Sequence, residues 1–380
     1  MMIVSIIVVF IISLLFIEKQ MVQRSVRSLR LRIHVNGTRG KSSVTEYVAA
    51  GLSDSLQEDV MAKVTGIIPS IIYKGVKERI TRYGVARVQE QINIIRLAHR
   101  KKVKNLVLEC MSIAPDLQKV ESSVFQPHIY VITNIRDDHR EAMGVSLDSQ
   151  AEAICSAIPK NCKVITNEKH FLDKIREKAA EHNSTVITAE ELDHEITGRL
   201  PYGVFPENIA LALAVCKEAG VDRNQAEMSI MNWISNCPPP LTTFSDGNKS
   251  LHFLNAFAVN DIDSTESFIN NWKKVIDHNG KTTIVLNTRA DRPLRTEMFS
   301  HWIAKDNQSY ERIILTGNHK GRARYSLIKS GVERMKIESW KRELLNNFKM
   351  NLINILSDRS LVIGVGNIGG DGFHILNTMK

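Results

Sequence analysis

The segment from Arg32 to Val48, RIHVNGTRGKSSVTEYV, constrains the fold of this chain more than any other. Leu31, Ile33 and Val35 alternate with polar residues, which predicts a short strand. A tight turn containing two glycines follows, and the residues from Lys41 onward have the pattern of a helix. A strand, a glycine turn and a helix N-terminus form a cradle for an anion, because backbone N–H groups and the positive end of the helix dipole point at it.

The residues in this turn suit a phosphate ligand. The spacing is G-x-x-G-K-S, two residues shorter than the common G-x-x-x-x-G-K-[ST] form. Lys41 supplies a mobile cation and Ser42 a hydroxyl for Mg²⁺. The alternative is a structural turn in which lysine and serine occur by chance, but the order of strand, turn, lysine and hydroxyl favours a nucleotide site. We predict that a nucleoside triphosphate binds the residues Asn36, Gly37, Thr38, Arg39, Gly40, Lys41, Ser42 and Ser43.

The N-terminus differs from the rest of the chain. Residues 1–17 carry no charge, and Ser5 and Ser13 are their only polar side chains. Seventeen residues is at the short end of what spans a bilayer. A signal peptide would need a basic region and a small-residue cleavage site, which are absent here, and a buried core helix is the other alternative. Basic residues follow from Lys19 to Arg32, so we predict a single membrane anchor over residues 1–20 with the rest of the chain cytoplasmic.

Composition restricts the class of protein only weakly. The net charge of +9 invites a nucleic-acid interpretation, but the basic residues are dispersed and no basic run is interleaved with aromatics, so we expect no nucleic-acid partner. The five cysteines are odd in number and form no C-x-x-C pair. We therefore expect reduced and mostly buried thiols rather than a zinc site or a disulfide framework.

Short apolar runs and helical patterns alternate along the chain, which indicates a doubly wound α/β fold. A break at residues 236–240, NCPPP, suggests a domain boundary near 240. We predict a P-loop ATP-binding domain over residues 21–240 and a smaller, Rossmann-like α/β domain over 241–380. The predicted strands cover residues 31–35, 60–64, 105–110, 128–134, 163–166, 185–187, 283–287, 312–316 and 360–365, and the predicted helices include 87–102, 206–220, 266–276 and 295–305.

Two candidate metal ligands follow strands of the first domain. Glu109 ends a hydrophobic strand, where a carboxylate is costly unless it is paired or binds a metal. His139 follows the strand that ends at Asn134, and imidazole is both a competent ligand and a common loop residue. Glu109 could instead form a buried salt bridge and His139 could be an ordinary surface histidine. Together with Ser42 they favour a metal site.

The pattern G-x-G-x-x-G occurs at Gly364 to Gly369, after a predicted strand. A dinucleotide site would need a following βαβ unit and an acidic residue about 20 positions further on. Only eleven residues follow Gly369, so we interpret this segment as a glycine turn at the edge of the second domain, facing the interdomain cleft.

These motifs together resemble the Mur ligase superfamily, and within it the membrane-anchored ligase subunits of poly-γ-glutamate synthases (the PgsB/CapB type). The resemblance covers nearly the whole chain. It is carried by the apolar N-terminus and the segments VNGTRGKSSVT, LECMSIAPDLQ, TNIRDDHREAMG, VFPENIALALAVCKEAG, NAFAVNDIDSTESF, NTRADRPLRT and GVGNIGG.

The resemblance implies roles for individual residues. Residues 37–43 would form the ATP phosphate loop, Ser42, Glu109 and His139 would bind Mg²⁺, and Asn208 would contact the adenine. Asp263 would lie near the ribose. Three further residues, Arg289, Asp291 and Arg292, would line the cleft and hold carboxylates or the γ-phosphate; arginine suits this role because its planar fork binds oxyanions bidentately.

Three departures from the superfamily pattern matter. The phosphate loop begins about twenty residues after the anchor, which leaves no room for the UDP-binding domain of the peptidoglycan ligases. No lysine occurs in residues 148–158, where the carbamylated lysine of the Mur ligases would be expected, so Glu152 or Glu141 could hold the second metal instead. Gly369 stands where histidine would be expected.

The implied activity is ATP-dependent amide ligation through an acyl phosphate, with glutamate and a growing poly-γ-glutamate chain as substrates. ATP and Mg²⁺ are the implied cofactors, and small integral-membrane subunits of the same synthase are the implied partners at the cell membrane. The alternative is a membrane-tethered P-loop ATPase or kinase-like regulator without ligase chemistry. That alternative does not predict the second α/β domain or the pairing of Glu109 with His139.

Overall fold

The computed structural model describes residues 2–56, 58–66, 69–82, 87–138, 140–201, 203–237, 239–259, 261–278 and 280–379. The chain divides into two compact units, which are described separately. The first unit comprises Met1–Leu200 and Val204–Cys237, and the second comprises Pro201–Gly203 and Pro238–Lys380.

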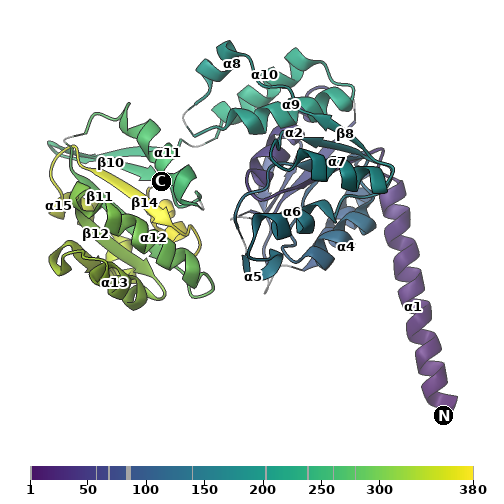
Figure 1. Ribbon diagram of the computed structural model, residues 1–380, viewed down its shortest axis with the longest axis horizontal. Helices are drawn as coiled ribbons and strands as arrows, with labels where there is room; N and C mark the ends of the chain where they lie inside the picture. The colour runs from purple at the N-terminus through teal and green to yellow at the C-terminus, as the bar shows by residue number, and fades with distance from the viewer. Residues whose placement is uncertain are drawn as a thin grey trace. The chain divides into compact units, whose positions relative to one another are not determined.

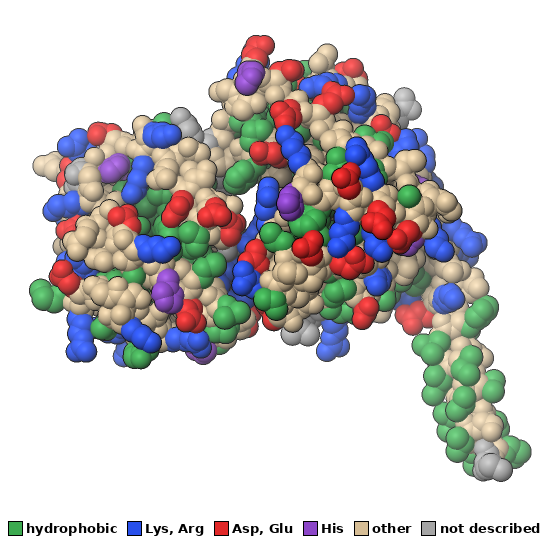
Figure 2. Space-filling model, viewed as in Figure 1, with side chains coloured by type: hydrophobic (Ala, Val, Ile, Leu, Met, Phe, Trp, Pro, Cys, Tyr) green, Lys and Arg blue, Asp and Glu red, His purple; other side chains and the backbone are tan. Residues whose placement is uncertain are grey.

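The first helix, α1 (Met2–Arg27), is long and apolar enough to cross a membrane, with a mean hydropathy of 2.5 over its most apolar window. None of that window is buried in the protein, so the alternative of a buried core helix is wrong. The helix extends away from the rest of the first unit (Figure 1), and apolar side chains cover the extending part (Figure 2). Its last turns join the domain: Glu18 pairs with Arg96 of α3 at 2.9 Å, and Val22 and Val26 are buried.

The first sheet has eight strands in the order β4-β3-β2-β5-β1-β6-β7-β8 (Figure 1). The six strands from β2 to β8 in that order are parallel, and β3 and β4 form an antiparallel extension at one edge. Their bounds are β1 (Leu31–Asn36), β2 (Val60–Val64), β3 (Ser70–Tyr73), β4 (Val76–Arg79), β5 (Asn105–Glu109), β6 (Ile129–Ile132), β7 (Lys163–Thr166) and β8 (Thr185–Thr188).

Helices cover both faces of this sheet, because successive strand residues point to opposite sides. On one face Ile33, Val35 and Val107 pack against α2, α9 and α10, and on the other Leu106 and Tyr130 pack in the layers formed by the remaining helices. The helices of this unit are α2 (Lys41–Ser53), α3 (Val88–Arg100), α4 (Pro115–Phe125), α5 (Arg140–Met143), α6 (Leu147–Cys155), α7 (Leu172–Glu181), α8 (His194–Arg199), α9 (Pro206–Glu218) and α10 (Arg223–Ser235).

The second unit contains a six-stranded sheet in the order β13-β12-β11-β14-β10-β9 (Figure 1). All neighbours are parallel except β9, which runs antiparallel to β10. The strands are β9 (Leu241–Asp246), β10 (Lys249–Asn255), β11 (Thr282–Thr288), β12 (Tyr310–Gly317), β13 (Ile337–Ser339) and β14 (Leu361–Gly366).

Two apolar layers cover this second sheet. Phe268, Phe299 and Leu327 pack on one face, and Phe348 and Ile375 on the other. The helices are α11 (Ile262–Lys273), α12 (Pro293–Lys305), α13 (Lys320–Lys329), α14 (Arg342–Asn346), α15 (Phe348–Ile355) and α16 (Asp371–Met379), with short 3₁₀ helices at Asn307–Ser309 and Arg334–Lys336.

The expected fold class, mixed α/β with a P-loop domain and a second α/β unit, is confirmed, and each predicted strand forms. The helix predicted over residues 266–276 instead runs from Ile262 to Lys273. Two antiparallel hairpins, β3–β4 and β9–β10, were not predicted. The expectation of reduced, mostly buried thiols is also confirmed: the cysteines are free, and four of them are buried.

Candidate functional site

The glycine turn between β1 and α2 lies at the carboxyl edge of the first sheet, where ligands of open α/β sheets bind. Gly37 and Gly40 have φ angles of +122° and +79°. A Cβ on Gly37 would lie 2.2 Å from Oγ1 of Thr133, just after β6. The turn therefore passes so close to the neighbouring strand that glycine is required at position 37.

Asn134 clamps this turn from the next strand. The Thr38 amide donates to its carbonyl oxygen at 2.9 Å, and the Arg39 amide donates to its Oδ1 at 3.0 Å. Its Nδ2 donates in turn to the Arg39 carbonyl at 3.2 Å. The sequence identifies Asn134 only as the start of the segment that leads to His139. The clamp depends on the pairing of β1 with β6, which no local pattern reveals.

Asn36 supports the turn from behind. Its side chain is buried and donates from Nδ2 to Gln118 Oε1 at 2.8 Å and to the Tyr130 hydroxyl at 2.7 Å. Its Oδ1 accepts from the Gly37 amide at 2.8 Å. Asn36 therefore uses its side-chain amide in hydrogen bonds within the protein, and these bonds hold the shape of the loop.

The helix N-terminus places two polar side chains in front of the loop. Lys41 lies over the turn, with Nζ donating to the carbonyl oxygens of Gly37 at 2.6 Å and Thr38 at 3.3 Å. Ser42 Oγ donates to Oε2 of Glu109 at 2.9 Å. The first turn of α2 leaves backbone amides without intrahelical partners, as every helix N-terminus does.

Glu109 joins the glycine loop to strand β2. It ends β5, is 3 % exposed, and its Oε2 accepts from the Thr65 amide at 2.6 Å as well as from Ser42. A Cβ on Gly66 would lie 2.6 Å from Ser42 Oγ, so the turn after β2 packs directly against this hydroxyl. The structure therefore brings together Ser42 and Glu109, two predicted metal ligands that are far apart in sequence.

Asn208 reaches the same loop from α9. It lies in the first turn of that helix, is 7 % exposed, and its Oδ1 would lie 2.4 Å from a Cβ on Gly40. The structure thus places the predicted adenine contact beside the phosphate loop.

The remaining predicted ligands of this unit differ in their surroundings. His139 lies outside the described residues, so its role stays a prediction. Glu152, suggested for the second metal, is half exposed and pairs with Lys174 at 3.2 Å and Lys178 at 3.5 Å. A carboxylate that the sequence did not single out, Glu168, is buried and accepts from the Ile135 amide at 2.9 Å, so it fixes the segment that follows Asn134.

Four predicted residues belong to the second unit. Asp263 lies in the first turn of α11, after β10. Arg289 follows β11 and pairs with Asp291 through Nε at 2.9 Å and through a terminal nitrogen at 2.6 Å, and Arg292 precedes α12 as its N-cap residue. All four follow parallel strands of the second sheet, so they lie at its carboxyl edge, and their roles stay predictions.

A second cluster of potential ligands lies behind Glu109. Single donor atoms of His34, Cys110 and Glu121 lie within 4.8 Å of one another, and all three residues are buried. The Glu121 carboxylate is already engaged, because it accepts from Gln91, from the Met111 amide and from Ser112. Burial and the charge of Glu121 raise the pKa of Cys110, which keeps this thiol protonated. We therefore assign the cluster to the hydrogen-bond network around Glu109.

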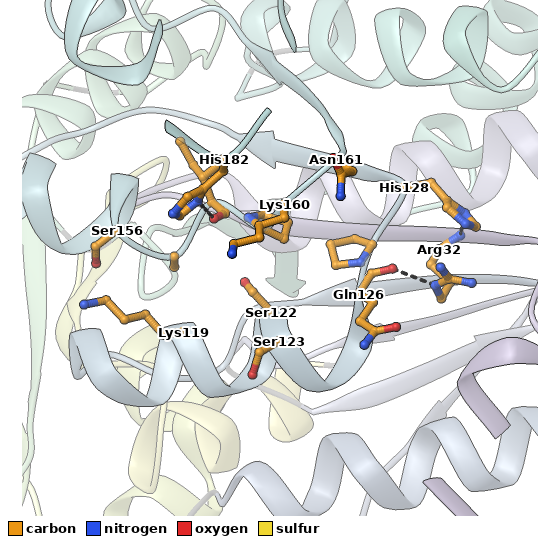
Figure 3. A pocket seen from close by; sticks show the side chains of 14 residues that line it. Arg32, Lys119, Ser122, Ser123, Gln126, His128, Ser156, Lys160, Asn161 and His182 are labelled. Carbon is orange, nitrogen blue, oxygen red and sulfur yellow. Dashed lines mark hydrogen bonds between the residues drawn. The ribbon is translucent and has the colours of Figure 1, made fainter. Parts of the chain in front are cut away.

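A cavity of about 750 Å³ opens at the opposite, amino edge of the first sheet (Figure 3). Two of its basic side chains bond to backbone carbonyls: Arg32 Nε to that of Gln126, the C-cap residue of α4, at 2.7 Å, and His182 Nδ1 to that of Ile158 at 2.5 Å. The C-terminus of α4 carries partial negative charge, which the Arg32 guanidinium offsets. None of the predicted site residues lines this cavity.

Comparison with known proteins finds matches along almost the whole chain. The Mur ligase middle domain matches residues 35–209, and the poly-gamma-glutamate synthase CapB C-terminal domain matches residues 241–380. The chain is 32% identical to capsule biosynthesis protein CapB of Bacillus anthracis, over 97% of this chain and 80% of that protein. It is 31% identical to PGA synthase CapB of Bacillus subtilis, over 96% and 93%. This chain belongs to the CapB family.

The fold of this CapB family member is also found in solved structures. It matches bifunctional folylpolyglutamate synthase/dihydrofolate synthase of Yersinia pestis, solved with AMPPNP and manganese, with a TM-score of 0.70 and 13% identity over 96% of this chain and 93% of that one. Folylpolyglutamate synthase of Mycobacterium tuberculosis matches with a TM-score of 0.69 and 12% identity, over 95% and 94%. At such identity the likeness concerns the fold, and it confirms the Mur ligase type of architecture.

Proposed function

We propose that this chain is an ATP-dependent ligase that joins glutamate through γ-linkages at the cytoplasmic face of the cell membrane. The observation that carries the proposal is the match to two CapB proteins along almost the whole chain, one named a PGA synthase and the other a capsule biosynthesis protein. The Ser42–Glu109 pair beside a glycine loop adds a site that suits a metal-bound nucleotide.

The chemical problem is that a carboxylate does not react with an amine at useful rates, because its leaving group is poor. In the proposed reaction the γ-carboxylate at the end of the growing chain attacks the γ-phosphorus of ATP, which gives an acyl phosphate and ADP. The amine of the next glutamate then attacks the activated carbonyl and releases phosphate. The protein contributes mainly by positioning the reactants and offsetting their charge.

The residues at the carboxyl edge of the first sheet suit this task. The turn at Gly37 to Ser43 and the N-terminus of α2 would hold the phosphates, and Lys41 would exchange its carbonyl partners for phosphate oxygens. Asn208, beside Gly40, would contact the adenine. Asp263 would lie near the ribose, and Arg289 and Arg292 would hold substrate carboxylates.

The donor set at Ser42 and Glu109 fits a divalent cation. A hydroxyl and a carboxylate are hard oxygen ligands, the kind that Mg²⁺ prefers, and they already lie 2.9 Å apart. His139 would complete a second position. Held there, Mg²⁺ would neutralise the charge that develops on the transferred phosphoryl group.

The membrane anchor would keep the synthesis of the polymer next to the site of its export. Helix α1 could span the bilayer, and the unit that follows it would lie in the cytoplasm next to small integral-membrane subunits of the same synthase. Deleting residues 2–17 should release the chain from membranes while the catalytic units still fold. Persistence of the shortened chain in the membrane pellet would contradict the anchor.

The proposal is tested by incubating membranes that contain the full chain with ATP, Mg²⁺ and labelled glutamate. We expect glutamate-dependent release of ADP and a labelled polymer that resists ordinary peptidases, with no polymer from a Lys41→Ala chain expressed at the same level. ATP hydrolysis that ignores glutamate and yields no polymer would favour a membrane-tethered ATPase or kinase-like regulator.

A further inference from the structure

A fully buried cation lies behind the proposed metal site. Lys63, in the middle of β2, is 0 % exposed. Its Nζ contacts Glu90 Oε1 at 2.7 Å, Gln91 Oε1 at 2.9 Å and the sulfur of Met111 at 3.4 Å. Burial lowers the pKa of Lys63, and the hydrogen bond and charge of Glu90 oppose that shift. A buried charge is tolerated only when it is paired in this way.

The amide of Gln91 links this cation to Glu109. Its oxygen accepts from Lys63, while Nε2 donates to the Glu109 carbonyl at 2.8 Å and to Glu121 Oε2 at 3.0 Å. The side chain is 3 % exposed. Because the ammonium lies on one side and two acceptors lie on the other, the amide has one satisfied orientation.

Glu121 completes the network from α4. It accepts from the Met111 amide at 3.2 Å and from the Ser112 hydroxyl, and it lies 3.6 Å from His34 Nε2. The backbone that leaves β5 is therefore held at two points. Gln91 donates to the Glu109 carbonyl, and Glu121 accepts from the Met111 amide.

These contacts define the direction in which the Glu109 side chain leaves the strand. Lys63 of β2 donates to the Gln91 side chain, which in turn donates to the Glu109 carbonyl. The amide of Thr65, just after β2, donates to the Glu109 carboxylate. Replacing buried ions by apolar residues of similar volume often leaves stability unchanged. Packing alone therefore does not account for Lys63, Glu90 and Glu121 at these positions.

We propose that Lys63, Gln91 and Glu121 are positioning residues that orient Glu109 for a divalent cation. The inference rests on the proposed function, because it takes Glu109 as the cation ligand. Outer-shell partners of metal ligands typically change metal affinity or activity about 10- to 100-fold when they are removed.

The test is Mn²⁺ binding by the full, detergent-solubilised chain with a non-hydrolysable ATP analogue, followed by electron paramagnetic resonance. Gln91→Leu removes, at similar volume, the hydrogen bond to the Glu109 carbonyl together with those to Lys63 and Glu121, and we expect the Kd for Mn²⁺ to rise about tenfold or more. The Mg²⁺ concentration for half-maximal turnover should rise in parallel, and saturating Mg²⁺ should restore most of kcat. Gln91→Glu keeps the oxygen that accepts from Lys63 but turns a second acceptor toward the Glu109 carbonyl and Glu121, so its Kd for Mn²⁺ should rise at least as much as that of Gln91→Leu.

A matched control is Ile95→Ala in the same helix, α3. Ile95 is 0 % exposed and has no polar group, so its truncation should lower stability without removing a hydrogen bond of the network. We expect the Kd of this variant for Mn²⁺ to stay at the wild-type value. An unchanged Kd in folded Gln91→Leu, or an equal rise in Ile95→Ala, would overturn the inference.

Two further variants separate this inference from the proposed function. If Gln91→Leu fails to fold, Glu121→Gln replaces it with the same expected rise in Kd, because the charge that holds Met111 and Ser112 is lost. If the wild-type chain binds Mn²⁺ no better than the Glu109→Gln variant does, Glu109 is not a ligand. That result would also refute the site in the proposed function. Binding that needs Glu109 but ignores both Gln91→Leu and Glu121→Gln would refute the positioning role alone.

Discussion

The two sheets each carry a glycine-rich turn between a central parallel strand and a helix, and the two turns are built differently. In the first, Gly37 and Gly40 lead into α2, which begins with Lys41 and Ser42. In the second, the turn after β14 leads into α16 and is tied back to β11. There Asn287 Nδ2 donates to the Gly369 carbonyl at 2.8 Å, and the Asn367 amide donates to the Asn287 carbonyl at 3.0 Å.

The first residue of each helix makes the larger difference. α16 begins with Asp371, whose carboxylate accepts from the Gly317 amide at 2.8 Å, from Thr316 Oγ1 at 2.7 Å and from Arg342 at 2.7 Å. The second turn thus has a built-in anion at its helix N-terminus, which is the place that a phosphate would take. The first turn has a lysine there. The residue after the glycines, more than the glycines themselves, separates a candidate phosphate site from a structural turn.

The largest effect should come from the side chains that distinguish the first turn. Lys41→Ala and Glu109→Gln should each lower glutamate-dependent ATP turnover about 100-fold or more, because each removes charge stabilisation of the transferred phosphoryl group. Turnover by purified full-length chains, with circular dichroism as the folding control, measures this. Wild-type turnover in either variant would mean that the first turn is not the site.

Matched glycine substitutions test the comparison directly. Gly40→Ala places a Cβ 2.4 Å from Asn208 Oδ1 at a φ of +79°, and Gly366→Ala places one 2.7 Å from the Asn287 carbonyl at +96°. Each should cost about 1–3 kcal/mol of stability through backbone strain. Only Gly40→Ala should also weaken binding of a fluorescent ATP analogue, by about tenfold, because the added methyl group narrows the turn that would hold the phosphates. Equal losses of ATP binding would show that the second turn also serves the nucleotide.

Acid should destabilise the first unit through a carboxylate behind the site. Burial alone would raise the pKa of Glu121, but the His34 side chain 3.6 Å away and the hydrogen bonds that Ser112 and Gln91 donate outweigh this and lower the pKa to about 2. The ionised group therefore stabilises the folded state fully above the unfolded pKa of about 4.3, and this stabilisation is lost as the pH falls through the folded value. Between pH 6 and pH 3 the unfolding free energy of wild type should fall by about 2 kcal/mol more than that of Glu121→Gln. Unfolding free energies, measured with urea, that fall by the same amount in both chains between pH 6 and pH 3 would contradict this.

The smallest effect is expected in the second turn. Asp371→Asn removes the charge that holds Arg342 and the Gly317 amide, and this should cost about 1–2 kcal/mol of stability by urea unfolding. ATP affinity should not change. Loss of ATP binding with wild-type stability would reverse the roles assigned to the two turns.

Much of the fold follows from local pattern, and the main exceptions are non-local. Alternating or continuous apolar runs predict strands such as Asn105–Glu109 because burial on a sheet requires those residues. The hairpin β3–β4 escaped prediction because Val76–Arg79 is exposed along its whole length and carries three charged residues in four. Such an edge strand has no hydrophobic periodicity.

The sequence marks the candidate ligands of the site but not the residues that support them. A carboxylate at the end of a buried strand marks Glu109, and a lysine after glycine marks Lys41. The lysine within VMAKV, a strand that is otherwise apolar, was the available signal for the network behind Glu109. Its partners Gln91 and Glu121 lie on helices of ordinary composition, and only the side-chain contacts in the folded unit show that they meet.

The central claim is that Ser42 and Glu109 hold a divalent cation beside a nucleotide in the first turn. The most direct measurement is a crystal structure of the chain with an ATP analogue and Mn²⁺, using anomalous scattering to locate the metal. The account predicts an anomalous peak about 2.0–2.3 Å from Ser42 Oγ and Glu109 Oε2, with the phosphates on the amides at the start of α2. Phosphates bound there with the metal away from Glu109, or a nucleotide bound at another site, would contradict it.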